Sequence, residues 1–339
     1  MFSPNQTSAG KGKALLIALI FIALILGGIG AFFRWGGSMG GSEKSPVIGI
    51  VSFGGSFQEA VTGLKEGMGT LGYKEGESVV YRDIDAAGSN EKVKEAASGF
   101  LRDHVDVIYA VSSNVTQQVS KVAHDVPVVF NVVGDPIGLG VAKTLASSGT
   151  NFTGCSVGQY TGKRLEILKS FLPGVHKVLV LYDPTNAYSQ QAITVLEKAA
   201  PDQGMTIIKK QVKSPDDVVK IMKDTKQGQY DAFFNFGEAK VSTVSKIVAD
   251  RAKEIKLPTL STGKNFAEEG TLITYGASWL ELGRQCASVM DKILHGVKPA
   301  DIPIQSPAKV ELTVNMKTAA LLGITFPKDQ LIRVDTFIE

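Results

Sequence analysis

From residue 46 onwards, the chain alternates short apolar runs with stretches of helical periodicity. The first apolar run, Val47–Phe53, precedes a stretch in which apolar residues recur three and four positions apart, from Phe57 to Leu71. Later runs of strand length, each separated from the previous one by a predicted helix, cover 78–83, 105–111 and 128–133. Strands joined through helices lie parallel, because the helix carries the chain back across the sheet. The pattern predicts an α/β fold with a parallel sheet.

A second series of strands and helices begins after residue 158. Its predicted strands are 177–182, 205–210, 231–236 and a short one from Pro258. Its predicted helices are 162–171, 186–200, 215–227 and 239–255. Two such series predict two Rossmann-like lobes with parallel sheets. We assign 46–157 to lobe 1 and 158–276 to lobe 2.

The C-terminal segment does not simply continue this alternation. It contains a predicted strand at 271–275, a long helix at 278–295, a strand at 309–314 and a short helix at 316–322. We expect it to pass back between the lobes, so that about 277–305 join lobe 1 and about 306–339 join lobe 2. Several crossings would form a hinge, and a hinge allows two lobes to close on a ligand.

The stretch 127–155 predicts an edge of the sheet at which a ligand binds. The strand Val128–Val133 leads into a Gly-Asp-Pro corner, then a predicted short helix, then a turn into 151–154, which we expect to lead towards the hinge. In open α/β sheets, ligands bind at the carboxyl ends of the strands. Asp135 therefore either faces the ammonium group of a ligand or only forms the turn before Pro136.

Further candidate ligand-binding residues follow other predicted strands of lobe 1. Ser52 and Phe53 end the first strand. Ser112, Ser113 and Asn114 end the third and begin a helix. Free backbone N–H groups and two hydroxyls at that position suit a carboxylate, although the same residues also make an ordinary N-cap.

Lobe 2 contributes candidate residues at the matching strand ends, which are Tyr182, Asn186, Asn235 and Tyr275. Asp183 and Asn186 have an alternative role as turn and cap residues. Aromatic residues lie at or near the strand ends of both lobes: Phe53, Phe57, Tyr182, Tyr188, Phe234, Phe236, Tyr275 and Trp279. We expect most of them in the core and the others in the apolar wall of a ligand pocket.

The sequence lacks the common signatures of catalysis, and we expect neither enzymatic activity, nor a cofactor, nor a metal. It has no G-x-S-x-G or H-E-x-x-H motif, and its four histidines stand alone near predicted helix ends or turns. The segment from Gly149 has the glycine spacing of a phosphate-binding loop, but Cys155 stands where the lysine must be. The first strand is followed by Gly-Gly-Ser, which is not a dinucleotide fingerprint.

Charge and cysteine content narrow the partners further. The net charge is +3 with no basic stripe, so we expect no nucleic acid. Cys155 and Cys286 are far apart in sequence and do not have the spacing of metal ligands. Two separate buried thiols are the favoured interpretation, and a single disulfide is the alternative.

The N-terminal segment predicts attachment to a membrane. Residues 14–33 form an uncharged apolar run long enough to cross a bilayer. Lys11 and Lys13 precede it and predict a cytoplasmic stub at 1–13, so the rest of the chain would lie outside the cell membrane as a single-pass protein. Residues 34–45 read as a flexible Gly/Ser linker. A cleaved signal peptide is the alternative interpretation.

The motifs from Val47 to about Ile332, taken together, resemble the substrate-binding proteins of ABC transporters, in the family that includes tryptophan- and tyrosine-binding members. The motifs that carry the resemblance are GLKEGMGTLGYKEGESV, DVIYAVSSN, PVVFNVVGDPIGLGVAKTL, GTNFTGCS, KRLEILKSFLPGVHKVLVLYDPTNAYS, ILHGVKPADIPIQ and VNMKTAALLGITFP. Many members of this family carry a cleavable signal, which often ends in a lipid-modified cysteine, whereas this chain has the apolar run instead.

The resemblance implies a periplasmic-binding-protein type I fold with a small ligand held between the lobes. It implies delivery of that ligand to a membrane permease with a cytoplasmic ATPase. By position in the motifs, Ser112, Ser113 and Asn114 would lie at the carboxylate end of the ligand and Asp135 near its amino end. The second lobe would contribute Tyr182, Asn186 and Asn235.

We therefore expect an extracytoplasmic receptor of an ABC importer, with an amino acid, first of all an aromatic one, as its ligand. The alternative is a sensory module with the same fold that passes ligand occupancy to a membrane signalling partner. The stub at 1–13 is too short for a kinase or DNA-binding domain, so that alternative requires a separate chain.

Overall fold

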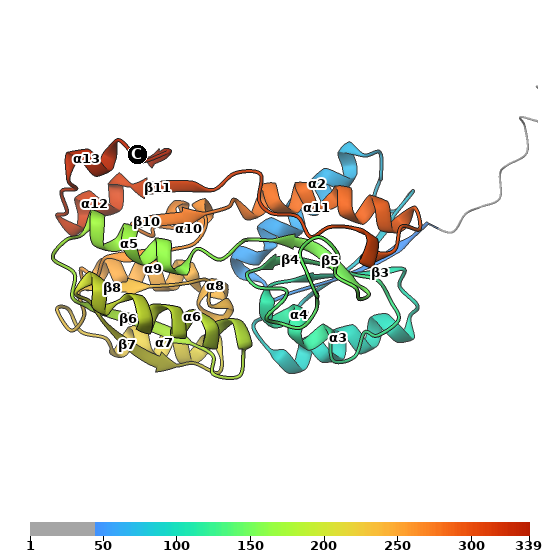
Figure 1. Ribbon diagram of the computed structural model, residues 1–339, viewed down its shortest axis with the longest axis horizontal. Helices are drawn as coiled ribbons and strands as arrows, with labels where there is room; N and C mark the ends of the chain where they lie inside the picture. The colour runs from blue at the N-terminus through green and yellow to red at the C-terminus, as the bar shows by residue number, and fades with distance from the viewer. Residues whose placement is uncertain (1–44) are drawn as a thin grey trace, which may run out of the picture. The chain divides into compact units, whose positions relative to one another are not determined.

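Two β-sheets with helices on their faces organise residues 45–339, which are the residues described by this computed structural model (Figure 1). The first sheet has the order β2-β1-β3-β4-β5, and all of its strands are parallel. Its strands are β1 (Val47–Ser52), β2 (Val80–Asp85), β3 (Val107–Val111), β4 (Val128–Val133) and β5 (Phe152–Ser156). The prediction of an α/β fold with two parallel-sheet lobes is confirmed.

The central strands of the first sheet are apolar along their whole length because both faces are covered. Every residue of β1, β3 and β4 is buried, whereas the edge strand β2 is mostly exposed. Continuous apolar runs are typical of parallel strands between two helical layers. The helices of this lobe are α2 (Gln58–Thr70), α3 (Asn90–Arg102), α4 (Ser113–Val119) and α11 (Trp279–Leu294), with the short turns η1 (Gly55–Phe57) and η3 (Pro299–Asp301).

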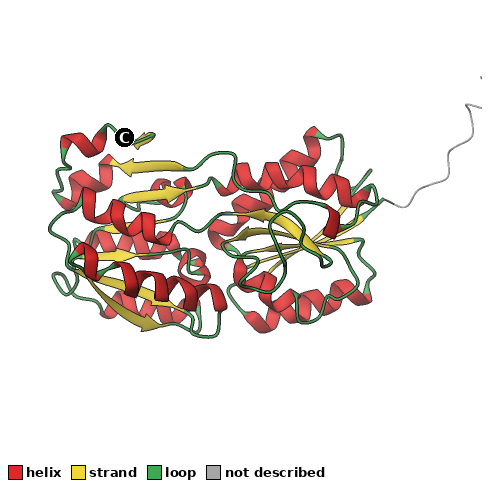
Figure 2. Ribbon diagram, in the orientation of Figure 1, coloured by secondary structure: helices red, strands yellow, loops and turns green. Residues whose placement is uncertain are grey.

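Helices α2 and α11 lie on one face of the first sheet, and α3 and α4 lie on the other (Figures 1 and 2). The contact between α2 and α11 depends on glycine. A Cβ atom on Gly63 would lie 2.0 Å from the Leu280 carbonyl oxygen, and one on Gly283 would lie 2.4 Å from the Ala60 carbonyl oxygen. Only residues without a side chain allow the two backbones to approach this closely.

The second sheet has the order β12-β11-β10-β9-β8-β6-β7. Its strands are β6 (Lys177–Tyr182), β7 (Thr206–Gln211), β8 (Ala232–Phe234), β9 (Thr259–Ser261), β10 (Ile273–Gly276), β11 (Glu311–Asn315) and β12 (Thr336–Ile338). Strands β10 and β11 pair antiparallel, and the other neighbours pair parallel. The parallel part of this sheet repeats the arrangement of the first.

The helices of the second lobe cover both faces of its sheet (Figure 2). They are α5 (Thr161–Phe171), α6 (Ala187–Ala199), α7 (Pro215–Asp224), α8 (Ala239–Thr243), α9 (Ser245–Glu254), α10 (Lys264–Glu268), α12 (Met316–Leu322) and α13 (Lys328–Leu331), with the turn η2 (Pro201–Gln203). Helix α7 starts as its sequence predicts, because Ser214 and Asp217 form a capping box around Pro215.

Three segments of the chain pass between the two lobes. They are 157–160 after β5, 277–278 between β10 and α11, and 306–310 before β11. Two of them are held together, because the Ser156 N–H donates to the Gln305 carbonyl at 2.9 Å and the Gln305 N–H donates to the Gly154 carbonyl at 2.9 Å.

Two predicted elements differ in the structure. The prediction of a short helix after Asp135 is wrong. The segment turns instead, because Asp135 Oδ1 accepts the Gly138 N–H at 2.9 Å and Gly140 takes a positive φ of 75°. The single helix expected at 239–255 is interrupted at Val244, which leaves the helical conformation at φ −119° and ψ 27°.

Other elements were not predicted at all. Residues 152–156 form the strand β5, which pairs with β4, whereas the sequence indicated only a connecting turn there. The short elements α10, α13 and β12 were also missed.

The predicted cysteine state is confirmed, because Cys155 and Cys286 are both free and buried in the first lobe. Within residues 45–339, no helix has the length and apolar character needed to cross a bilayer. The predicted membrane segment at 14–33 lies outside the described residues.

Candidate functional site

A cavity lies between the two lobes at the carboxyl ends of their strands. Lobe 1 and the hinge line it with Phe57, Ser112, Ser113, Asn114, Val132, Gly134, Val157 and Trp279. Lobe 2 lines it with Arg164, Tyr188, Phe236, Gly237, Ala239 and Thr262. Its volume of about 20 Å³ has room for one water molecule. An amino acid would enter this space only if the lobes separated.

The three predicted residues at the end of β3 line this cavity. Ser112 caps α4, because its Oγ accepts the Val115 N–H at 3.2 Å. Ser113 Oγ accepts the Gly134 N–H at 3.2 Å, and Asn114 Nδ2 donates to Asp183 Oδ2 of the other lobe at 3.3 Å. The capping role and the position beside the cavity therefore occur together.

The backbone is strained at two positions that line the cavity. Ser112 has a φ of +105° and Val132 has a φ of +57°. Positive φ is rare for a residue with a side chain, above all for a β-branched one. The pairing of β4 with β5 shifts register between Asn131 and Val133, so the strain coincides with an irregularity of the sheet. Strain of this kind concentrates at functional sites.

Arg164 is the one charged residue that lines the cavity. Helix α5 carries it, and its side chain is 1% exposed. Its Nε donates to the Tyr275 carbonyl at 2.7 Å and its Nη1 to the Phe236 carbonyl at 3.4 Å. Burial lowers the pKa of Arg164, and contact with the Tyr188 hydroxyl partly opposes this effect.

Sequence reasoning missed Arg164 because it considered strand ends and not helix faces. Arg164, Leu168 and Phe171 are spaced by four and three positions, and all three are buried. An arginine on the apolar face of a predicted helix was the available signal.

A buried polar cluster of lobe 2 lies next to the cavity. Lys240 Nζ forms an ion pair with Asp183 Oδ2, and the two side chains are 1% and 2% exposed. Burial alone would raise the pKa of Asp183, but Lys240 and hydrogen bonds from Thr185 hold it below its ordinary value. Glu238 accepts hydrogen bonds from Ser189 Oγ and from the Asp183 N–H, the latter at 3.1 Å. Burial raises the pKa of Glu238.

Side chains of the two lobes also meet outside the set of residues that line the cavity. Asn186 Nδ2 donates to Gln117 Oε1 at 3.1 Å. Ser56 of lobe 1 contacts Ser245 Oγ at 2.7 Å and donates to Glu269 Oε1 at 2.7 Å. These contacts hold the lobes together in the arrangement described.

Seven of the predicted ligand-binding residues do not line the cavity. Ser52 Oγ accepts the Gly54 N–H and the Gln58 amide, and Phe53 is fully buried in the core of lobe 1. The carboxylate of Asp135 accepts the Gly138 N–H, which is the turn-forming alternative.

The other four belong to lobe 2. Asn186 takes its alternative role as the N-cap of α6, because its Oδ1 accepts the Ser189 N–H at 3.0 Å. Asn235 Oδ1 accepts the N–H groups of Gly237 and Glu238, so its side chain shapes the loop after β8. Tyr182 reaches the exposed Gln211 at 3.3 Å. Tyr275 contributes its carbonyl to Arg164, while its ring packs edge-on against Tyr160.

Four of the predicted aromatic residues do line the cavity. These are Phe57, Tyr188, Phe236 and Trp279. The Phe57 and Trp279 rings stack with centroids 4.8 Å apart, and the Tyr188 and Phe236 rings meet edge-on at 6.0 Å. Each lobe therefore contributes an aromatic pair to the wall.

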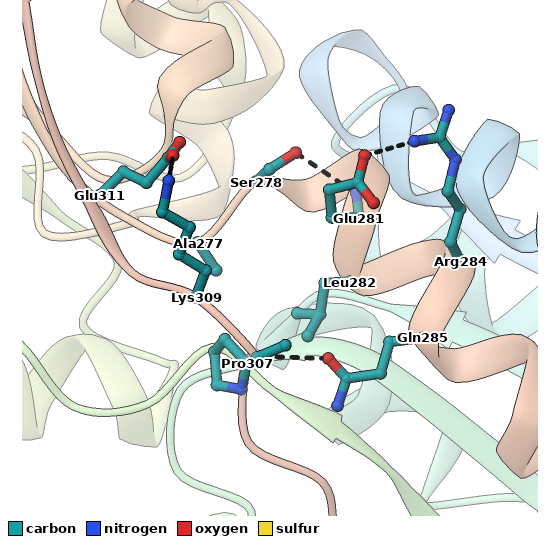
Figure 3. Close-up of a pocket in the computed structure, with 10 residues that line it drawn as sticks. Ala277, Ser278, Glu281, Leu282, Arg284, Gln285, Pro307, Lys309 and Glu311 are labelled. Carbon is teal, nitrogen blue, oxygen red and sulfur yellow. Dashed lines mark hydrogen bonds and ion pairs between the residues drawn. The ribbon is translucent and has the colours of Figure 1, made fainter. Parts of the chain in front are cut away.

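A larger cavity, with a volume of about 380 Å³, lies on the hinge (Figure 3). It is bounded by the start of α11 and the crossing segment around Lys309. Figure 3 shows that its charged groups pair with one another, Glu281 with Arg284 and Lys309 with Glu311. Because these charges are already neutralised, the hinge cavity is a weaker candidate for a ligand site than the interlobe cavity. Across residues 45–339, no group of three or more histidine, cysteine or acidic side chains is arranged to hold a metal ion.

Comparison with known proteins agrees with this architecture. The family model described as "ABC transporter substrate binding protein" matches residues 45–337. The two-lobed α/β unit thus defines a solute-binding class of protein. The chain belongs to the ABC transporter substrate-binding protein family.

Individual relatives are distant but match over most of their length. A tyrosine-binding protein of Clostridioides difficile is 25% identical over 285 residues, which cover 84% of this chain and 82% of that protein. A Streptococcus structure solved in complex with L-Trp has a TM-score of 0.79 and 23% identity, over 87% of this chain and 100% of that one. A ligand-free, open substrate-binding protein of Clostridium difficile has a TM-score of 0.59 and 25% identity, over 87% of this chain and 99% of that one.

Proposed function

We propose that this chain is the extracytoplasmic receptor of an ABC importer and that it binds a small ligand in the interlobe cavity. The observation that carries the proposal is the cavity itself, since polar and aromatic side chains of both lobes meet there. A ligand that contacts both lobes stabilises their closed arrangement. The permease recognises that arrangement and receives the ligand, with a cytoplasmic ATPase as the source of energy.

The relatives suggest aromatic amino acids as the first ligands to test. One is named a tyrosine-binding protein, and another was solved with L-Trp. The aromatic pairs Phe57–Trp279 and Tyr188–Phe236 supply a wall suited to a planar side chain.

The TM-scores support a closed arrangement of the lobes. Two relatives of similar identity and coverage differ in TM-score, 0.79 for the L-Trp complex against 0.59 for the ligand-free, open structure. A difference in lobe separation lowers a global similarity score without changing either lobe. The contacts of Asn114 with Asp183 and of Ser56 with Ser245 fit this interpretation.

A membrane tether is part of the proposal. The apolar run at 14–33 would anchor the chain, and the linker at 34–45 would let the receptor reach its permease. Fractionation of cells that express the full chain tests this proposal. We expect the intact chain in the membrane fraction, and a shortened, freely soluble chain would indicate cleavage instead.

Thermal unfolding of the full chain against the twenty amino acids tests ligand binding. A ligand at about 100 times its Kd stabilises the folded state by about 2.7 kcal/mol, which is a clear shift in Tm. We expect the largest shifts from aromatic members. The ligand class proposed here is wrong if no amino acid shifts the midpoint.

A further inference from the structure

Arg164 carries a positive charge that no carboxylate neutralises. Among residues 45–339, no acidic side chain lies within ion-pair distance of its guanidinium. Its hydrogen bonds go to two backbone carbonyls, and its guanidinium lies 5.8 Å from the centre of the Tyr160 ring. Because a guanidinium has five N–H donors, donors remain for a further acceptor.

The cavity that Arg164 lines contains no acidic residue. All of the other lining residues are uncharged. The nearby acids are committed elsewhere, since Asp183 pairs with Lys240 and Glu238 accepts from Ser189. Asp135 holds the turn at Gly138 and does not line the cavity. The site thus carries one positive charge without a matching negative one.

An isolated buried charge is costly unless a counter-charge accompanies it. Arg164 is 1% exposed, so water compensates its charge poorly when the lobes are closed. A carboxylate is the acceptor that matches the planar fork of a guanidinium, and such charge-assisted bonds are stronger than neutral ones. A cationic group in the same cavity would add to the unbalanced charge.

We propose that Arg164 anchors the carboxylate of the ligand, and that an amino group on the ligand receives no charged partner from the cavity. This assignment rests on the proposed receptor function and narrows its ligand class to small acids with an apolar, ring-bearing body. It also moves the anchor of the acid group from lobe 1 to lobe 2. Ser112, Ser113 and Asn114 of lobe 1 line the same cavity as Arg164, so they face the anchored ligand from the opposite lobe.

Calorimetric titration of the full chain with matched ligands tests the assignment. The probes are L-tryptophan, indole-3-propionate, which lacks the amino group, and L-tryptophanamide, which lacks the acid. The corresponding set built on tyrosine serves as a second series. We expect the two acids to bind within about fivefold of each other and the amide to bind about 10- to 100-fold more weakly, as loss of a charge-assisted hydrogen bond implies.

The variant Arg164→Gln should weaken both acids by about 10-fold or more and leave the amide unchanged. Arg164→Lys keeps the charge but loses the fork, and we expect it to recover part of the affinity. Circular dichroism of each variant reports whether the lobe still folds. If Arg164→Gln does not fold, the affinities of the unaltered chain for the acid and for the amide test whether the cavity anchors the carboxylate.

The possible failures are distinct. The anchoring role is overturned if the unaltered chain binds the amide as tightly as the acid. It is also overturned if a folded Arg164→Gln variant binds the acid as tightly as the unaltered chain does. Either result leaves the receptor function intact. If L-tryptophan instead binds more than about 10-fold tighter than indole-3-propionate, a difference of about 1.4 kcal/mol, the amino group has a strong partner. That result would overturn the claim that the cavity offers this group no charged partner. If no probe of either series binds the unaltered chain, the proposed aromatic ligand class fails, and the assignment to Arg164 fails with it.

Discussion

Lys240 and Asp183 show how a single buried pair supports the second lobe. Each charge is almost fully removed from water, and each is the other's main partner. Removing one member of such a pair leaves the other charge buried without compensation, which is more damaging than losing both. Asn114 reaches this pair from the opposite lobe, so the pair also contributes to the contact between lobes.

Lys240→Met should lower the free energy of unfolding by about 3 to 5 kcal/mol, because Asp183 keeps a buried charge without a counter-ion. The double variant with Asp183→Asn should lose less than the sum of the single losses. Urea unfolding followed by circular dichroism measures both. Lys163→Met, which removes one member of an exposed pair with Glu166, is the matched control and should change stability by less than about 1 kcal/mol. An equally small effect of Lys240→Met would contradict the account.

Glu59 adds a dependence on pH at the rim between the lobes. It lies on α2 of lobe 1, half-buried, and faces Glu268 and Glu269 of lobe 2. Burial, followed by repulsion from these two acids, raises its pKa to about 7 from 4.5. A raised pKa means that the folded protein holds this proton more tightly than the unfolded chain does.

The stability that protonated Glu59 contributes is therefore fully present below pH 4.5 and is lost as the pH rises through 7. Glu59→Gln removes this dependence. The Tm of the variant should match that of the unaltered chain below pH 4.5 and exceed it at pH 8. A Tm difference that stays constant over this range would show that Glu59 does not titrate in the folded protein as described.

The sequence predicted those cavity residues that directly follow an apolar strand, and it missed cavity residues that lie elsewhere. Ser112, Ser113 and Asn114 follow a strongly apolar strand, so their position at the cavity could be anticipated. Asn235 also follows a strand, but its oxygen is used by the backbone of its own loop. Sequence alone does not reveal which polar side chain a loop uses internally. Arg164 lies within helix α5, and a prediction based on the residues that follow strands does not include it.

The close packing of α2 against α11 in lobe 1 can be traced to individual glycines in the sequence. Gly63 and Gly67 are four positions apart and face α11, whereas Gly69 points into open space. The same residue type therefore has opposite consequences at positions within one helix.

Alanine substitutions at Gly63 and Gly69 test the close packing of α2 against α11. Gly63→Ala should destabilise the protein by about 2 kcal/mol or more, because its Cβ would collide with the Leu280 carbonyl and force the helices apart. Gly69→Ala should be neutral or stabilise by up to about 1 kcal/mol, because alanine favours the helix and meets no neighbour. Denaturant unfolding of the two variants measures the contrast. Similar effects of both substitutions would show that helix propensity, and not close packing, dominates.

The elements that sequence predicted well are the ones with a strong periodic pattern. The runs at β1, β3 and β4 are fully buried and apolar, so their assignment needed no tertiary information. Helix α10 has five residues and β12 has three, which is too short for a period to show. The break at Val244 depends on local backbone geometry that helical periodicity does not report.

At the scale of the whole described unit, the arrangement of lobes gives the cavity its role. Three crossings on one side form the hinge. On the other side the lobes approach so closely that a Cβ on Gly88 would lie 2.4 Å from Pro215. In the proposed receptor, opening at this contact would expose Arg164 and the aromatic pairs to solvent, and closing would bury them around a ligand.

The distance across this opening is the most direct test of the account. Spin labels on Lys94→Cys in α3 and Lys220→Cys in α7 report on it, because both positions are exposed while Cys155 and Cys286 are buried. The account predicts that L-tryptophan or indole-3-propionate shifts the distance distribution of the full chain saturably towards the short separation, and that L-tryptophanamide at the same concentration does not. A distribution that none of these ligands changes, or that the amide changes equally, would contradict it.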